Sequence, residues 1–266
     1  MSTTKRKLAF VLAASDHGTM IVSRLDYRMV SSTGGFGVGF EILESGAFSP
    51  NEVSLARSIL DLRRRYFNDG VLAIDCGANI GVHTIDWAKH MTGWGSVLAV
   101  EAQERIYYAL AGNIVINNCF NAVALNAAIS DAPGMLKIPR PDYLVPSSFG
   151  SLELRRTSNT EYIGQPIDYS EGSLAEVQAI SIDSLKLPRI DFIKIDVEGM
   201  EMEALTGAVE AINRHRPAML IETIKTDAEI LQQWLEGRDY ATFKADINVL
   251  AVHKSDHILP HLKQVG

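Results

Sequence analysis

Short apolar runs alternate with longer amphipathic segments along most of this chain. Five runs have the length and composition of buried strands, at residues 71–75, 96–101, 122–129, 191–196 and 218–222. Segments with apolar positions at helical spacing lie around them, at residues 50–67, 82–91, 105–117, 200–215 and 227–236. Strands separated by helices are joined by right-handed crossovers, so the pattern predicts an α/β fold with a mostly parallel sheet.

The two ends of the chain depart from this alternation. Two β-like stretches, residues 240–244 and 248–252, are joined by a short connection and should pair as an antiparallel hairpin. Residues 8–22 read as strand, turn and strand, and they begin a β-rich N-terminal lead-in. The alternative for this segment is a secretory signal, because Lys5-Arg6-Lys7 precedes the apolar run.

A helix should close the lead-in. Ser49 is the expected N-cap, Pro50 takes the first helical position, and Glu52 completes a capping box. The arginines at residues 63–65, near the end of this helix, are expected to form a solvated face or a small basic patch. We therefore divide the chain into residues 1–67, the lead-in and helix, and residues 68–266, the main domain. Prolines punctuate an insertion at residues 131–180, where proteins of this class commonly build substrate specificity.

Composition limits the partners and the cellular compartment that we expect for the protein. The 266 residues are 47% hydrophobic, and the sequence has no apolar run that approaches the length of a membrane span. A formal net charge of −7 argues against nucleic acid as a partner. Only two cysteines, Cys76 and Cys119, are present, which excludes a disulfide framework and fits a reducing compartment. We therefore expect a cytoplasmic protein.

The turn after the first strand is the most informative motif. Asp75 ends the strand, and a turn from Gly77 to Gly81 opens the next helix. Backbone N–H groups in such a turn can approach a ligand closely. The carboxylate before the turn disfavours phosphate and suits an ammonium or a ribose hydroxyl. S-adenosylmethionine has both groups and no phosphate, so we assign its methionine end to Asp75, Gly77, Asn79, Gly81 and Thr84.

Further polar residues follow the other strands. Ligands of open α/β sheets bind outside the carboxyl ends of the strands. Glu101 ends the second strand, and its carboxylate suits the two ribose hydroxyls. Ser130 and Asp131 follow the third strand, where the adenine would be read, although Asp131 also begins an ordinary turn sequence.

The fourth and fifth strands supply the expected catalytic residues. Asp196 should face the transferred methyl group and the acceptor, as a general base or an orienting acceptor, and it also borders the cofactor. Glu198 and Glu222 lie beside it in the predicted fold. These three carboxylates would alternatively hold a divalent cation, but we do not favour that reading and assign no metal ligand. Lys194 is expected to be an inward structural lysine, on the face of its strand opposite to the nearer neighbours of Asp196.

Together these motifs resemble the FkbM family of S-adenosylmethionine-dependent methyltransferases. The similarity covers residues 68–255 and is carried by Asp75–Thr84, Val100-Glu101, Ala128–Asp131 and, most specifically, Phe192–Glu201. It implies a class I methyltransferase fold, Rossmann-like, with a C-terminal antiparallel hairpin. It also implies O-methylation of a hydroxyl on a saccharide, glycan or secondary metabolite. Val100-Glu101-Ala102 departs from the Phe-Glu-Pro common in the family, and the divergent insertion leaves the acceptor open.

Other functions make different demands on the sequence. A nicotinamide-dependent oxidoreductase requires Gly-x-Gly-x-x-Gly after the first strand, and the residues from Gly77 to Gly81 lack that spacing. A non-catalytic methyltransferase-like subunit would have degraded cofactor positions, whereas these are intact. An amine or nucleic-acid acceptor for the same cofactor stays open, as does assembly into a homo-oligomer.

Overall fold

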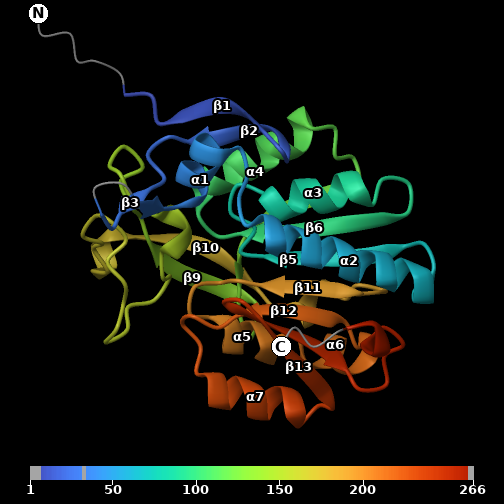
Figure 1. Cartoon of the computed structure of the whole chain (residues 1–266). Coiled ribbons are helices and arrows are strands. Elements are labelled where there is room, and N and C mark those ends of the chain that lie inside the picture. Colours follow the sequence, from blue (N-terminus) through green and yellow to red (C-terminus); the bar gives the residue numbers. More distant parts are fainter. Residues whose placement is uncertain (1–6, 32–33, 263–266) are drawn as a thin grey trace, which may run out of the picture. The chain divides into compact units, whose positions relative to one another are not determined.

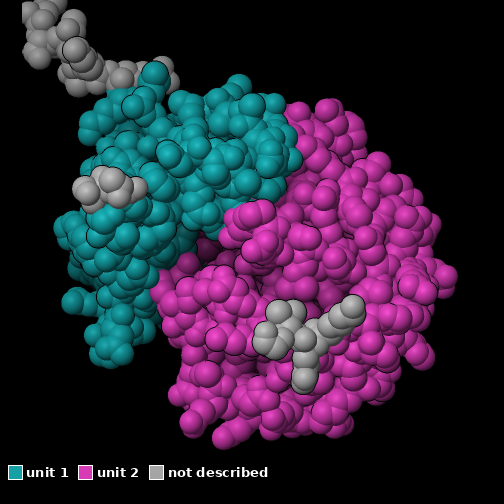
Figure 2. All heavy atoms as spheres, viewed as in Figure 1, with its two compact units in different colours: residues 1–48, 137–175 teal, residues 49–136, 176–266 magenta. Residues whose placement is uncertain are grey.

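The computed structural model describes residues 7–31 and 34–262. The chain forms two compact units, one of residues 1–48 and 137–175 and the other of residues 49–136 and 176–266 (Figure 2). Lys5 and Arg6, on which the alternative of a secretory signal partly rests, lie outside the described residues. Within the described part of the chain, none of the helices combines the length and apolar character needed to cross a membrane.

The first unit begins with the predicted strand, turn and strand. Strands β1 (Phe10–Ser15) and β2 (Gly18–Ser23) pair antiparallel, followed by the short pair β3 (Arg28–Met29) and β4 (Gly35–Phe36) and by helix α1 (Val38–Ser45). Buried Asp26 joins the two segments of this unit, because its carboxylate accepts the N–H of Gly39 at 3.0 Å and that of Phe149 at 2.9 Å. Burial raises the pKa of Asp26 to about 6.

The second unit contains a sheet of seven strands in the order β13-β14-β12-β11-β5-β6-β7. Its parallel strands are β5 (Val71–Cys76), β6 (Gly95–Glu101), β7 (Ala122–Asn126), β11 (Phe192–Ile195) and β12 (Ala218–Glu222). Strand β14 (Asn248–His253) is antiparallel to both β12 and β13 (Tyr240–Ala245). The predicted mostly parallel sheet with a C-terminal antiparallel hairpin is thus confirmed.

Helices connect these strands where the apolar spacing predicted them. They are α2 (Pro50–Phe67), α3 (Val82–His90), α4 (Glu104–Ile116), α5 (Glu201–Thr206), α6 (Val209–His215) and α7 (Ala228–Glu236). Helix α2 packs on β5 and on α3, and α3 packs on β6, whereas α7 packs on β13 (Figure 1). Short 3-10 helices lie at Phe149–Ser151, Glu171–Ser173, Asp183–Leu185 and Leu259–His261.

Two predicted elements are divided in the structure. The expected strand at 122–129 becomes β7 and β8 (Ala128–Ile129), and β8 joins β10 (Leu174–Ile180) and β9 (Gly134–Pro139) in a separate sheet of order β8-β10-β9. The expected helix at 200–215 breaks at Gly207 into α5 and α6. A Cβ atom at Gly207 would lie 2.2 Å from the carbonyl oxygen of Ser130, so the backbone passes there only without a side chain.

Helix α2 shows two departures from the expectation. Ser49 has a φ of 44° and makes no side-chain capping bond, and the Glu52 side chain turns toward α3 instead of closing a capping box. Arg63, expected on a solvated face, is only 3% exposed and pairs with the buried carboxylates of Asp191 and Asp256. Arg63 lies one helical turn after Ile59 and Leu60, so it belongs to the buried face of α2.

Candidate active site

The turn after β5 is held in left-handed backbone conformations. Gly77, Asn79 and Gly81 have φ values of 79°, 49° and 93°. A Cβ atom on Gly77 would lie 1.7 Å from the carbonyl oxygen of Asp196, so only glycine lets this turn pass directly against the end of β11. The turn and the fourth parallel strand of the sequence therefore meet at one edge of the sheet.

Asp75 is buried beneath this turn, at 1% exposed. The Thr84 hydroxyl donates a hydrogen bond to its Oδ2 atom over 2.6 Å, so that hydroxyl is directed at Asp75. Lys194 is the residue paired with Asp75 on the neighbouring strand β11. Burial raises the pKa of Asp75, and the Lys194 ammonium and the Thr84 hydroxyl oppose that shift.

Glu101 at the end of β6 bonds to the same turn. Its Oε2 accepts the N–H of Asn79 at 3.0 Å, and its Oε1 accepts the N–H of Gln103 at 2.7 Å. Burial raises the pKa of Glu101 to about 7, against the lowering effect of these two bonds. Each carboxylate oxygen has a second lone pair, so Glu101 retains the capacity to accept two hydroxyl donors.

Ser130 and Asp131 follow β8 at the end predicted for the adenine. The Ser130 hydroxyl donates to Oδ1 of Asp131 over 3.0 Å, and the Ser130 N–H donates to the carbonyl of Ile180 over 2.9 Å. Ser130 is buried, whereas Asp131 is exposed. Their role toward a ligand stays a prediction.

The three predicted catalytic carboxylates come together at the ends of β11 and β12. One oxygen from each of Asp196, Glu198 and Glu222 lies within 4.8 Å of the others. Lys194 contacts Oδ2 of Asp196 at 2.6 Å, and Lys225 contacts Oε2 of Glu198. Every second residue of a strand points to the same side, so Lys194 lies on the same face as Asp196, and it is buried, as expected for an inward lysine.

The glutamates of the Asp196-Val-Glu-Gly-Met-Glu201 segment have different surroundings. Glu201 is buried and accepts the N–H groups of Val197 and Gly199, each at 3.1 Å, and the Thr226 hydroxyl at 2.7 Å. These bonds hold the turn around Glu198, which has a φ of 54°. Glu201 therefore fixes the loop, and Glu198 extends toward Asp196 and Glu222.

Burial and mutual repulsion perturb this cluster strongly. The pKa of Glu222 rises to about 8, first through burial and then through the charge of Asp196. Burial and Asp196 likewise raise the pKa of Glu198. Burial would lower the pKa of Lys194, but the carboxylates of Asp196, Glu52 and Asp75 outweigh it and keep this lysine charged. Groups shifted in this manner at the end of a sheet are typical of functional sites.

A polar network that the sequence pattern did not predict lies beside Lys194. Glu52 of α2 accepts a hydrogen bond from Asn248 Nδ2 at 2.9 Å, contacts His83 Nε2 at 2.8 Å, and lies 3.8 Å from Lys194. These residues come from α2, α3, β11 and β14. The one signal of this network in the sequence was the spacing of Lys194 and Asp196, because residues two positions apart on a strand share a face.

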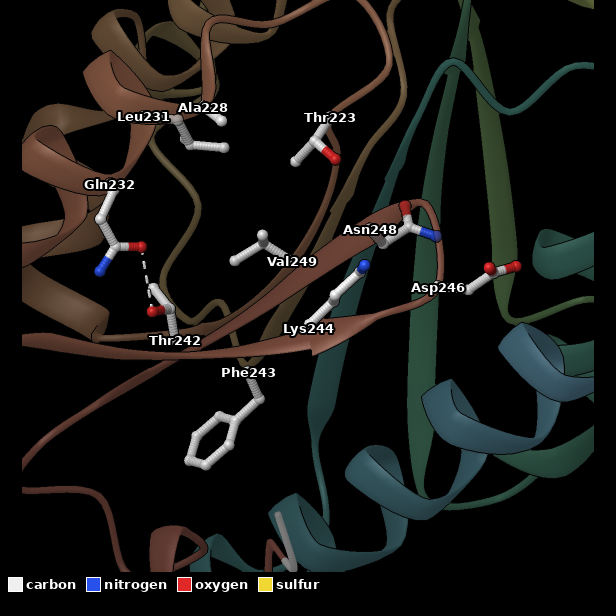
Figure 3. Close-up of a pocket in the computed structure, with 10 residues that line it drawn as sticks. All are labelled: Thr223, Ala228, Leu231, Gln232, Thr242, Phe243, Lys244, Asp246, Asn248 and Val249. Carbon is white, nitrogen blue, oxygen red and sulfur yellow. Dashed lines mark hydrogen bonds between the residues drawn. The ribbon is translucent and has the colours of Figure 1, made fainter. Parts of the chain in front are cut away.

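A pocket of about 280 Å³ lies nearby, between α7 and the β13–β14 hairpin (Figure 3). Its lining combines apolar residues such as Leu231 and Val249 with polar ones, and the Gln232–Thr242 hydrogen bond of 3.1 Å lies at one side. None of the three cluster carboxylates lines it. The pocket therefore lies beside the carboxylate cluster and shares Asn248 with the polar network around Glu52.

Comparison with known proteins places this geometry in a family. A family model described as the methyltransferase FkbM domain matches residues 75–243, more than half of the chain. Methyltransferase sdnD of Sordaria araneosa is 29% identical over 156 residues, which are 52% of this chain and 60% of that protein. The chain thus matches less than two thirds of that relative's length.

Two solved methyltransferase structures are also similar to this chain. Methyltransferase FkbM from Methylobacillus flagellatus KT is 19% identical with a TM-score of 0.49, covering 72% of this chain and 48% of that chain. A SAM-dependent methyltransferase from Aquifex aeolicus is 12% identical with a TM-score of 0.37, covering 77% and 97%. The order and directions of the seven strands are those of the class I methyltransferase fold, as predicted. From the matched domain, which includes the turn, Glu101 and the carboxylate cluster, we conclude that the chain belongs to the FkbM methyltransferase family.

Proposed function

We propose that this protein is an S-adenosylmethionine-dependent methyltransferase that methylates a hydroxyl group of a saccharide, glycan or secondary metabolite. The observation that carries the proposal is the position of Glu101. Its buried carboxylate is bonded to the N–H of Asn79, which ties the end of β6 to the turn after β5. Family membership adds the methyl-transfer chemistry.

The donor half of the site would consist of Glu101, Asp75 and the turn between Gly77 and Gly81. Glu101 would accept the two ribose hydroxyls on the free lone pairs of its oxygens. Asp75 would attract the ammonium group, which its burial next to a left-handed turn favours. Ser130 and Asp131 would border the adenine. When bound, S-adenosylmethionine supplies an electrophilic methyl group.

The acceptor half would be the cluster of Asp196, Glu198 and Glu222. In this half a carboxylate would hold the acceptor hydroxyl and would accept its proton as the oxygen takes up the methyl group that the cofactor would supply. Asp196 suits the orienting role, because Lys194 fixes its Oδ2 and its side chain is 31% exposed. Displacement of this kind depends chiefly on the alignment of the reacting groups, so the cluster acts by positioning and by accepting the proton.

Calorimetric titration tests the donor half. The full chain should bind S-adenosylmethionine and its demethylated product, S-adenosylhomocysteine, and Glu101→Ala should abolish both. Glu104→Ala is the matched control, because Glu104 begins α4 three residues away and is exposed. Absence of binding by the wild type at millimolar ligand, or equal binding by Glu101→Ala, would contradict the proposal. Mass analysis of products from hydroxyl and amine acceptors then tests the methylated atom.

A further inference from the structure

Glu222 is an unusual member of the carboxylate cluster, because it is buried without a partner. Its side chain is 8% exposed, and its Oε2 atom has no hydrogen-bond partner. Among the residues that the structure describes, no cationic side chain lies within salt-bridge distance of it. A buried carboxylate left in this state is costly unless it binds a proton or another cation.

The two neighbouring carboxylates are only half used by protein groups. Lys194 contacts Oδ2 of Asp196, and Lys225 contacts Oε2 of Glu198. Within the described chain, Oδ1 of Asp196 and Oε1 of Glu198 accept no hydrogen bond. Three carboxylates therefore converge with two ammonium groups, and Glu222 is the one without an ammonium partner.

The separation of the three carboxylates fits one metal ion. One oxygen from each of them lies within 4.8 Å of the other two. A cation with metal–oxygen bonds of about 2.1 Å, such as Mg²⁺, holds opposite ligands about 4.2 Å apart, and Ca²⁺ holds them about 4.8 Å apart. Oxygen ligands without sulfur or imidazole select hard cations.

We propose that Asp196, Glu198 and Glu222 form a binding site for one hard divalent cation. The site lies in the acceptor half described above, so its consequence rests on the proposed function. There the cation would hold the acceptor oxygen beside Asp196 and favour loss of the hydroxyl proton. The sequence pattern alone did not favour this cation. The observation that favours a bound cation is that Glu222 is buried without a hydrogen-bond partner.

Binding of Mn²⁺ to the metal-stripped full chain tests the site without cofactor or acceptor. The electron paramagnetic resonance signal of free Mn²⁺ should report one site per chain, with competition by Mg²⁺ or Ca²⁺. Glu222→Gln should weaken binding about tenfold or more, since it removes one charged ligand. Glu229→Gln, an equal change at an exposed position of α7, should leave binding unchanged.

A gain-of-affinity variant guards against misfolding as the cause of a loss. Lys225→Met removes the ammonium that competes for Glu198 and should tighten Mn²⁺ binding about threefold or more. The proposal is overturned if the wild type shows no single Mn²⁺ site with a Kd below one millimolar. Equal binding by Glu222→Gln and Glu229→Gln, or weaker binding by Lys225→Met, would also overturn it. Titration with S-adenosylhomocysteine in a chelator separates the two proposals. Product binding without Mn²⁺ binding would leave the methyltransferase proposal standing, and the reverse would leave only the cation site.

Discussion

Cofactor binding should weaken as the pH falls, because Glu101 must be ionised to accept two ribose hydroxyls. Burial raises the pKa of Glu101 in the free protein to about 7. Below that pH the carboxyl holds a proton that must leave before the ligand binds, so the apparent Kd grows as the protonated fraction grows. From pH 8 to pH 6 the ionised fraction falls about tenfold, which is about 1.4 kcal/mol of binding free energy.

Titration calorimetry with S-adenosylhomocysteine at pH 8, 7 and 6, in the presence of a chelator, measures this dependence. Glu101→Gln should bind weakly and show a clearly smaller change with pH, because one of the titrating carboxyls of the donor half is gone. Glu222→Gln should keep the tenfold change, which separates the effect of Glu101 from that of Glu222, whose pKa is also raised. A wild-type Kd that moves less than about twofold over this range would refute the reasoning, as would a full pH effect in Glu101→Gln.

Three further predictions concern the scaffold of the site, and chemical denaturation measures each. Gly77→Ala should lower the free energy of unfolding by about 3 kcal/mol or more, or prevent folding, because its Cβ would lie 1.7 Å from a backbone oxygen. Gly93→Ala is the control, with a similar φ of 83° and no atom within 4 Å, and should cost only about 1 kcal/mol. Equal losses would contradict the steric argument. Arg63→Met should lose about 3–5 kcal/mol by leaving the buried carboxylate of Asp256 without a cation, whereas Asp191 keeps its ion pair with Arg189. Arg64→Met, at an exposed ion pair, should lose less than about 1 kcal/mol, and similar values for both would refute the role of burial. Thr84→Val should cost about 1–3 kcal/mol by removing the donor to Asp75, and Thr84→Ser should restore most of it; a neutral Thr84→Val would show that this bond contributes little.

The sequence predicted the sheet and the edge where the site lies for one physical reason. Strands buried on both faces are continuous apolar runs, and the carboxyl ends of parallel strands meet at one edge. Asp75, Glu101, Asp196 and Glu222 each end or directly follow such a run, so the amino-acid sequence suffices to place them at that edge. Their arrangement around the turn and the cluster followed from strand positions alone.

The partners of charged side chains on helix α2 could not be predicted in the same way. Glu52 matched a capping box, a local signature, but its carboxylate bonds instead to Asn248, which lies 196 positions away in the sequence. Arg63 looked like part of a solvated charge run, and only the tertiary partners Asp191 and Asp256 make its burial tolerable. Local patterns fix the element on which a residue lies, whereas the partner of a buried charge depends on the whole fold.

The two halves of the site differ in how their carboxylates are neutralised, and this difference indicates where the chemistry occurs. Asp75 and Glu101 accept N–H or O–H donors from their own scaffold, which preorganises them for a ligand that brings further donors. In the Asp196–Glu201 segment, Glu201 bonds to the backbone and holds Glu198 in a left-handed conformation that costs about 1 kcal/mol or more. The fold thus keeps a strained backbone at Glu198, which directs its carboxylate at Asp196 and Glu222 although the three carboxylates repel one another. Such an arrangement is explained by a group that the carboxylates bind together, a proton or a cation, and it supports our proposal that the acceptor binds at this cluster rather than at the turn after β5.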